Sequence, residues 1–312
     1  MKRLIENRII IVRRQTRLDE LIIRFNTIGQ AKFYIEHLGS SFEEYEAEHH
    51  KYYESLNSVK NLVTSIAKMQ VIDRSFLPNF IFAKDDIIVV VGQDGIVANT
   101  LKYLNGQCLI GINPDRSRWD GVLLPFDPPN IADVILDVAQ EKREFKVVTM
   151  GKIQLQNGQQ MLAVNDFFIG QKTHTSARYS IQYNGKEESQ SSSGIIISTG
   201  LGASGWMRSV RTGATGITQQ MTNKKMEFKS NPEDTWSSDW LTFSVREPFP
   251  SKTTGTNILY GKIQAGKMMT VRSHMGENGV IFSDGIEKDF LEFNSGMEAK
   301  VFVADLKGKI II

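Results

Sequence analysis

The segment at residues 87–103, IIVVVGQDGIVANTLKY, contains the residues best suited to chemistry. Five apolar residues, 87–91, favour a strand buried on both faces, and helical spacing of apolar residues begins at Ile96. The turn GQDG between them aims backbone N–H groups and a positive helix end at an anion. A carboxylate at Asp94 then favours phosphoryl transfer, with a cation or a reacting hydroxyl between acid and phosphate. The alternative is an ordinary strand–helix turn capped by Asp94.

A second group of polar residues lies in the C-terminal half of the chain. Asn165 and Asp166 end an alternating segment. An amide beside a carboxylate can bind a vicinal diol, although a strand-end turn is the simpler explanation of the pair alone. Residues 191–206, SSSGIIISTGLGASGW, join an apolar strand to a glycine-rich loop that a ligand can approach closely. Trp206 could stack on a ring or belong to the core. Asp284, in an SDG triplet, is either part of a tight turn or another carboxylate near the site.

Alternating strands and helices surround the first group of residues. Such alternation indicates a mostly parallel sheet covered on both sides, with a site at the carboxyl ends of the strands. The strand segments are 9–12, 70–73, 87–91 and 108–113, and the helical segments before residue 70 are 17–25, 30–38 and 42–67.

The sequence pattern changes at a proline-rich segment, FDPPN, at residues 126–130. A helix is expected at 131–142, and short strands with Asn-Gly hairpin turns follow it. We therefore expect an α/β domain at residues 1–125 and a separate, largely antiparallel β domain from 126. Within the second domain, a helical stretch is expected after Thr199, a polar loop or short helix at 222–235, and two strands in the last fourteen residues, 299–312.

Composition excludes several classes of protein. The 312 residues are 41% hydrophobic and 23% charged, which is typical of a globular protein. A net charge of +2 gives no general basis for binding nucleic acid or an anionic membrane. The single cysteine, Cys108, allows no internal disulfide, and no apolar run approaches the roughly 18 residues of a membrane span. We expect a cytoplasmic protein.

Taken in order, these motifs resemble those of the NAD kinase family, and most closely its mitochondrial-type branch. GQDGI at 92–96 corresponds to the family's GGDGT loop, Asn165-Asp166 to its Asn-Glu pair, and residues 198–206 to its STPTGSTAY loop. FSDG at 282–285 also has a counterpart. Further segments similar to the mitochondrial-type branch are 110–126, 167–179 and 243–248.

The resemblance implies a Rossmann-like N-terminal α/β domain and a C-terminal β-rich, sandwich-like domain, with the site in the cleft between them. It places the β-rich domain at about 126–294 and returns the last strands, about 295–312, to the first domain. It implies phosphoryl transfer from ATP with Mg²⁺ to the adenosine 2′-hydroxyl of NAD, giving NADP. The metal would bridge donor phosphates with few direct protein ligands, and a homodimer is expected.

The resemblance also implies a role for each matched residue. Asp94 would contact the 2′-hydroxyl as general base, while Gly92 and Gly95 would shape the phosphate-binding turn. The residues that would bind the dinucleotide are Asn165, Asp166, Ser204, Gly205, Trp206 and Asp284.

Departures from the family pattern concentrate in the donor loop, where Gln93 replaces a glycine and Ile96 a threonine. They raise the alternative of a dinucleotide-binding protein in which transfer is slowed or lost. A kinase of another alcohol, such as a lipid or sugar, is a further alternative. The sequence does not distinguish NAD from NADH as acceptor, or ATP from another donor.

Overall fold

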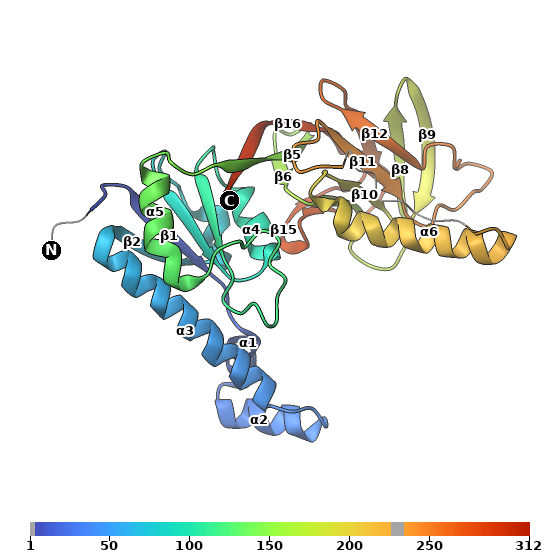
Figure 1. The fold of residues 1–312 in the computed structure, drawn as a ribbon. Coiled ribbons are helices and arrows are strands. Elements are labelled where there is room, and N and C mark those ends of the chain that lie inside the picture. The colour runs from blue at the N-terminus through green and yellow to red at the C-terminus, as the bar shows by residue number, and fades with distance from the viewer. Residues whose placement is uncertain (1–3, 226–233) are drawn as a thin grey trace. The chain divides into compact units, whose positions relative to one another are not determined.

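The computed structural model describes residues 4–225 and 234–312. The chain divides into two compact units, Met1–Lys146 with Lys309–Ile312, and Val147–Gly308 (Figure 1). Residues 226–233 of the polar segment expected at 222–235 lie outside the described residues.

The first unit is built on parallel strands, as the alternating pattern predicts. Its strands lie in the order β2-β1-β3-β4. Every residue of the apolar run is buried in β3, which lies between two neighbours. The strands are β1 (Arg8–Arg13), β2 (Lys68–Asp73), β3 (Ile87–Val91) and β4 (Cys108–Ile112).

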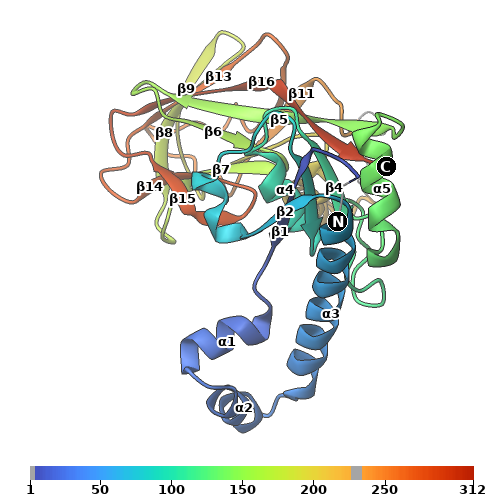
Figure 2. The same ribbon diagram turned by 90° about the vertical axis from the view of Figure 1, so that its left-hand side faces the viewer.

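Helices cover both faces of this sheet. Apolar side chains of α3 (Glu43–Ile66) and α5 (Ile131–Ala139) form one core with the sheet, and Figure 2 shows α4 (Asp94–Leu101) on the opposite face. The hairpin of α1 (Arg17–Phe25) and α2 (Ile28–His37) has a small core of its own. Short 3₁₀ turns complete the unit: η1 (Arg74–Asn79) and η2 (Pro128–Asn130).

The second unit is β-rich, and its main core lies between the inner faces of antiparallel strands. One sheet has the order β12-β11-β10-β7-β14-β15, with bounds β7 (Asp166–Gln171), β10 (Ile195–Ser198), β11 (Trp240–Val245), β12 (Tyr260–Gln264), β14 (Gly279–Ser283) and β15 (Ile286–Glu292). The other strands are β5 (Phe145–Leu155), β6 (Gln160–Ala163), β8 (Ala177–Tyr183), β9 (Lys186–Ser192), β13 (Met269–Ser273) and β16 (Glu298–Ile311). An α/β unit followed by an antiparallel β-rich unit is the fold class that the sequence predicts.

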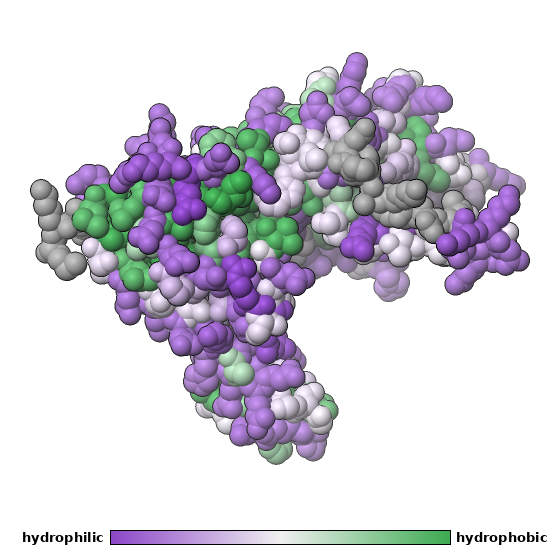
Figure 3. Space-filling view, in the orientation of Figure 1, coloured by the Kyte–Doolittle hydropathy of each residue, from purple (hydrophilic) through white to green (hydrophobic). Residues whose placement is uncertain are grey.

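One helix interrupts the strands of the second unit. It is α6 (Trp206–Thr222), preceded by the short turn η3 (Gly202–Ser204). Only Met207 of α6 is buried, so the first turn anchors the helix on the sheet while the rest is accessible. Hydrophilic side chains cover its far end in Figure 3.

The last residues of the chain differ from expectation. Two strands were predicted at 299–312, but a single strand, β16, spans Glu298–Ile311. Its beginning pairs antiparallel with β13, and Lys309 and Ile310 pair parallel with β4, so the polar DLKGK segment between them stays extended instead of turning. Strand β15 was not predicted, because its sequence, IEKDFLE, is too polar to show a clear apolar alternation.

The first unit also continues beyond residue 125, where the sequence suggested a boundary. Helix α5 shares a core with α3, so the unit extends to Lys146. At the other end of the chain, only Lys309–Ile312 belongs to this unit. Among the described residues, no helix is both long enough and apolar enough to cross a membrane.

Candidate functional site

The turn after β3 places Asp94 at the first residue of α4. Gly92 lies in close packing, because a Cβ atom there would come within 2.8 Å of the Ile96 side chain. Gly95 is exposed, and a Cβ atom there would meet nothing within 4 Å. Asp94 itself is half-buried. The turn is therefore fixed on its inner side and open at Gly95.

Backbone N–H groups of a neighbouring loop hold the carboxylate of Asp94. The N–H of Leu123 donates to Oδ1 at 2.8 Å, and that of Val122 lies 3.3 Å from Oδ2. The loop comes this close because Gly111 of β4 has no side chain: a Cβ atom there would lie 2.1 Å from the carbonyl oxygen of Leu123. Asp94 thus has a fixed orientation.

Asn113 organises the same loop. Its buried side chain donates from Nδ2 to the carbonyl of Trp119 at 2.9 Å and accepts at Oδ1 from the N–H of Asp115 at 3.0 Å. Gly121 has a φ of +64°, a left-handed conformation that favours glycine. Asn113 is the last residue of the predicted strand 108–113, at the end where a site is expected, but nothing in the sequence indicates contact between Leu123 and Asp94.

A cluster of arginines lies near the Gly92 turn. Arg14, which follows β1, packs beside Gly92 and forms an ion pair with Glu48 at 2.8 Å. Glu48 also contacts Arg17 and Arg118. Burial raises the pKa of Glu48, but hydrogen bonds from Arg14 and Arg17 outweigh it and hold the pKa below its usual value. The surplus of guanidinium groups gives this part of the unit a positive charge.

In the second unit, the carboxylate of Asp284 holds the turn that contains Asn165 and Asp166. It accepts from the backbone N–H groups of Val164, Asn165 and Asp166, at 3.1, 2.6 and 3.3 Å. The N–H of Asp284 in turn donates to the carbonyl of Asp166 at 2.9 Å. Asp284 and Gly285 both have positive φ, and they form the tight turn between β14 and β15. Asp284 is therefore a turn residue whose carboxylate contacts the backbone of the Asn-Asp pair.

Asp166 is buried at the start of β7. Burial, and to a smaller extent the nearby charge of Asp284, raises the pKa of Asp166 to about 7. Near neutral pH this acid is therefore partly protonated, and its carboxyl group can donate as well as accept a hydrogen bond.

The glycine-rich loop after β10 packs directly on the same turn. The N–H of Thr199 donates to the carbonyl of Asn165 at 2.9 Å, and a Cβ atom at Gly202 would lie 2.1 Å from that oxygen. Ser204 donates its hydroxyl to a backbone carbonyl, that of Leu201, at 3.3 Å. Gly205 separates η3 from α6. The two motifs of the second unit are thus packed against each other.

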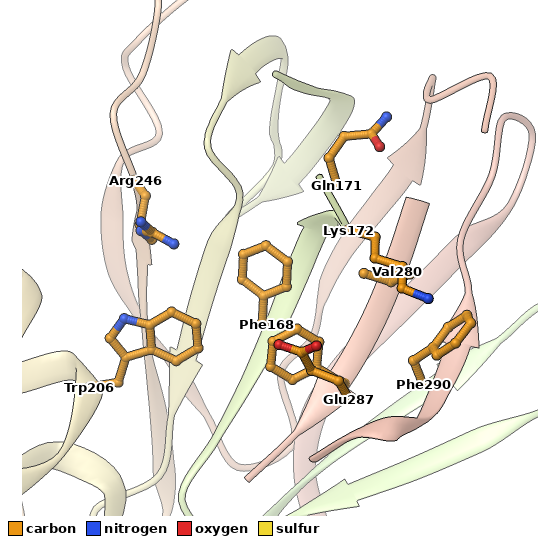
Figure 4. Close-up of a pocket in the computed structure, with 9 residues that line it drawn as sticks. Phe168, Gln171, Lys172, Trp206, Arg246, Val280, Glu287 and Phe290 are labelled. Carbon is orange, nitrogen blue, oxygen red and sulfur yellow. The ribbon is translucent and has the colours of Figure 1, made fainter. Parts of the chain in front are cut away.

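Trp206 lines a pocket of about 200 Å³ on the outer face of the six-stranded sheet (Figure 4). Its ring stacks on Phe168, with 5.9 Å between centroids and 12° between planes, and Phe168 stacks on Phe282 at 4.9 Å. Arg246 and Lys172 also line the pocket. The sequence indicated Trp206 alone, because its partners are distant in the chain.

The predicted site residues therefore fall in two groups. Gly92, Asp94 and Gly95 lie together in the first unit, and the dinucleotide-binding candidates lie in the second. Asp284, Asn165 and Asp166 are in direct contact, and the loop that leads to Ser204 adjoins them. Within the described part of the chain, no group of three or more His, Cys, Asp or Glu side chains could hold a metal ion.

Comparisons with known proteins identify the fold. No family model and no curated protein matches the sequence. Among solved structures, an NAD kinase from Archaeoglobus fulgidus in complex with ATP has a TM-score of 0.56 at 15% identity, covering 98% of this chain and 93% of that one. Yeast NADH kinase complexed with NADH has a TM-score of 0.58 at 12% identity, covering 98% of this chain and 83% of that one.

These similarities cover nearly the whole chain and define its class as an α/β unit joined to a β-rich unit. The chain has the fold of the NAD and NADH kinases, which confirms the resemblance that the motifs indicated at the level of the fold.

Proposed function

We propose that this protein is an NAD(H) kinase that transfers the terminal phosphoryl group of ATP to the adenosine 2′-hydroxyl of the dinucleotide. The observation that carries the proposal is the oriented, half-buried carboxylate of Asp94 at the start of α4, in a turn open at Gly95. The two solved structures with this fold are described as complexes with ATP and with NADH.

In this mechanism, Asp94 is the general base for the adenosine 2′-hydroxyl. A ribose hydroxyl is a weak acid, so Asp94 orients it and accepts its proton late, as the new bond to phosphorus forms and the bond to the leaving oxygen of ADP breaks. The backbone N–H groups of Val122 and Leu123 keep the carboxylate from rotating. Positioning of this kind supplies a large part of the rate in phosphoryl transfer.

The second unit supplies the dinucleotide-binding groups. Asn165 and Asp166 bind the ribose diol, and Asp284 holds their backbone in place. Ser204, Gly205 and Trp206 line the dinucleotide further along the loop. A kinase of a lipid or simple sugar would have less use for an amide and an acid paired in this way.

In this proposal the metal would enter with the phosphates of the donor. Both oxygens of Asp94 already accept backbone hydrogen bonds, and the described residues offer no acidic cluster for a dedicated cage. Mg²⁺, brought in with ATP, would neutralise charge on the donor phosphates. Gly92 and Gly95 shape the turn for those phosphates, and the positive cluster around Arg14 favours an anion nearby.

A second candidate function rests on the donor loop. Ile96 is buried and packs toward Gly92 in place of a threonine hydroxyl, and Gln93 adds a side chain where phosphate should approach the backbone. A dinucleotide-binding protein with slow transfer would show these features, although the retained Asp94 favours a kinase.

The experiment is to incubate the purified protein with ATP, Mg²⁺ and NAD or NADH, and to identify the product by an NADP-specific dehydrogenase and by mass. The proposal predicts a 2′-phosphorylated dinucleotide that depends on ATP. Tight dinucleotide binding by calorimetry without any phosphorylated product would support the second candidate and contradict the first.

A further inference from the structure

One face of helix α3 holds segments that follow three strands of the first unit. The hydroxyl of Tyr52 accepts from the backbone N–H of Arg14, just after β1, at 2.9 Å. The same hydroxyl donates at 3.1 Å to the carbonyl of Val91, the last residue of β3. Ser55, three residues further along the helix, donates at 2.9 Å to the carbonyl of Pro114, just after β4. Helix α3 therefore fixes the edge of the sheet at which the Gly92 turn lies.

Glu48 lies on this same face, one helical turn before Tyr52, and it is buried. Its carboxylate forms ion pairs with arginines from three segments: Arg14 on Oε1 at 2.8 Å, and Arg17 and Arg118 on Oε2. In the described part of the chain, Glu48 is the one acid that forms an ion pair with any of these arginines. A single carboxylate thus holds three guanidinium groups.

The positive charge of this cluster exceeds what Glu48 can neutralise. Water solvates Arg17, whose side chain is 44% exposed, but the side chain of Arg14 is only 9% exposed. The Nε atom of Arg14 is buried and has no hydrogen-bond partner among the described residues. Unmatched charge and an unpaired donor in a buried position cost free energy, which a bound anion would offset. The cluster is therefore better suited to binding an anion than to stabilising the fold.

Arg14 is the member of the cluster beside the phosphate turn. Its Cδ atom lies 3.8 Å from the position that a Cβ atom at Gly92 would take, and its guanidinium lies 5.0 Å from the ring centre of Tyr52. Without the charge of Glu48, this buried guanidinium would lose its counter-charge and turn toward water, away from the turn. The place of Arg14 therefore depends on Glu48.

We infer that Glu48 is a positioning residue for the phosphoryl donor: it holds Arg14 beside the Gly92 turn, where the guanidinium contacts the phosphates of ATP. This inference rests on the proposed function and deepens its donor side. Glu48 itself stays away from the substrate, because both of its oxygens are paired with arginines.

The test measures the dissociation constant of ATP with Mg²⁺ for the full-length protein by calorimetry. Glu48→Gln keeps the size of the side chain but removes its charge, and it should raise the dissociation constant by about tenfold, the effect of losing one charged hydrogen bond. Dinucleotide affinity should stay unchanged, because the proposed dinucleotide groups lie in the second unit. Glu48→Asp keeps the charge on a shorter side chain and should give an intermediate value.

Glu54→Gln is the matched control, because it removes the same charge from the same helix, where Glu54 forms an exposed pair with Lys51. It should bind ATP like the unaltered protein. Arg14→Met should weaken ATP binding about as much as Glu48→Gln, and the double variant should be no weaker than either, since both changes remove one interaction. A merely structural role for Glu48 would not produce this lack of additivity.

Melting temperatures establish which variants are folded, and Glu48→Asp decides the matter if Glu48→Gln does not fold. An unchanged dissociation constant, tighter ATP binding, or effects of Glu48→Gln and Arg14→Met that add fully would each overturn the inference. Weaker ATP binding in Glu48→Gln, when the unaltered protein forms no phosphorylated dinucleotide, would support the inference and count against the kinase. Product formation with an ATP affinity that does not depend on Glu48 would support the kinase and overturn the inference. No binding of ATP to the unaltered protein would overturn both.

Discussion

The carboxylate of Asp94 accepts a hydrogen bond from the backbone N–H of Leu123 over 2.8 Å. Asp94 is the first residue of α4, and Leu123 lies in the connection between β4 and α5. Gly111 allows the contact, because a Cβ atom at residue 111 would lie only 2.1 Å from the carbonyl oxygen of Leu123. The orientation of the proposed base thus depends on a residue with no side chain.

Gly111→Ala should therefore lower turnover without weakening dinucleotide binding. The added methyl group must displace the backbone of Leu123, which would rotate or release the carboxylate of Asp94. A misplaced catalytic group costs on the order of a hundredfold in rate. The measurement is kcat together with the dinucleotide dissociation constant.

Gly213→Ala is the control, because a Cβ atom at this helical position of α6 meets nothing within 4 Å. Its kcat should stay that of the unaltered protein, and its stability should rise slightly. An unchanged kcat for a folded Gly111→Ala protein would show that Leu123 does not control Asp94.

Asp284→Asn should weaken dinucleotide binding and destabilise the second unit. Asparagine tolerates the positive φ of 54°, but it loses the charge that three backbone N–H groups contact. Loss of charged hydrogen bonds predicts a decrease of about 1–3 kcal/mol in the free energy of unfolding. Urea titration and calorimetry measure the two effects; full stability with unaltered affinity would refute a positioning role for Asp284.

Asp166→Asn should increase stability at pH 8 while it weakens dinucleotide binding. Because the folded pKa is raised to about 7, the folded protein keeps a proton that the unfolded chain releases near pH 4. The unaltered protein therefore loses stability as pH rises from about 4 to 7, and the asparagine variant lacks this loss. The expected gain at pH 8 is about 2–4 kcal/mol, and it should shrink toward pH 4.

Urea titrations of both proteins from pH 4 to pH 8 follow this difference. A variant that is less stable than the unaltered protein at pH 8, or a gap that does not change with pH, would show that Asp166 is not a strained, partly protonated acid.

The double substitution Gln93→Gly and Ile96→Thr should raise ATP-dependent turnover. It removes a side chain from the phosphate turn and returns a hydroxyl to its first helical residues, while the dinucleotide groups of the second unit are untouched. Truncating the buried Ile96 should reduce stability by about 1 kcal/mol, so activity is compared well below the melting temperature. Equal or lower turnover would mean that these residues do not limit donor use.

Local patterns predicted most elements of the fold. The apolar run of β3, the helical spacing of α3 and the turn residues before β15 all depend on neighbours in the chain. The continuity of β16 was not predictable in this way, because a polar segment stays extended only when distant strands pair with its two ends.

In the candidate site, too, local motifs were predictable and contacts between distant residues were not. Asp94 and the Asn165-Asp166 pair carry recognisable side chains in short motifs. The contacts that hold them come from elsewhere: Leu123 uses only its backbone, Gly111 acts by having no side chain, and Asp284 lies 118 residues from Asp166. Such relationships arise from the folded backbone and leave no local pattern.

The most direct test of the account is the rate of phosphoryl transfer in Asp94→Asn under single-turnover conditions, with ATP, Mg²⁺ and saturating dinucleotide. Asparagine keeps the size of the side chain and one oxygen that can accept from Leu123, but it cannot take up a proton. We predict a rate at least about a hundredfold lower, with dinucleotide affinity within a few fold of the unaltered protein. A rate equal to that of the unaltered protein would contradict the role of Asp94 as general base.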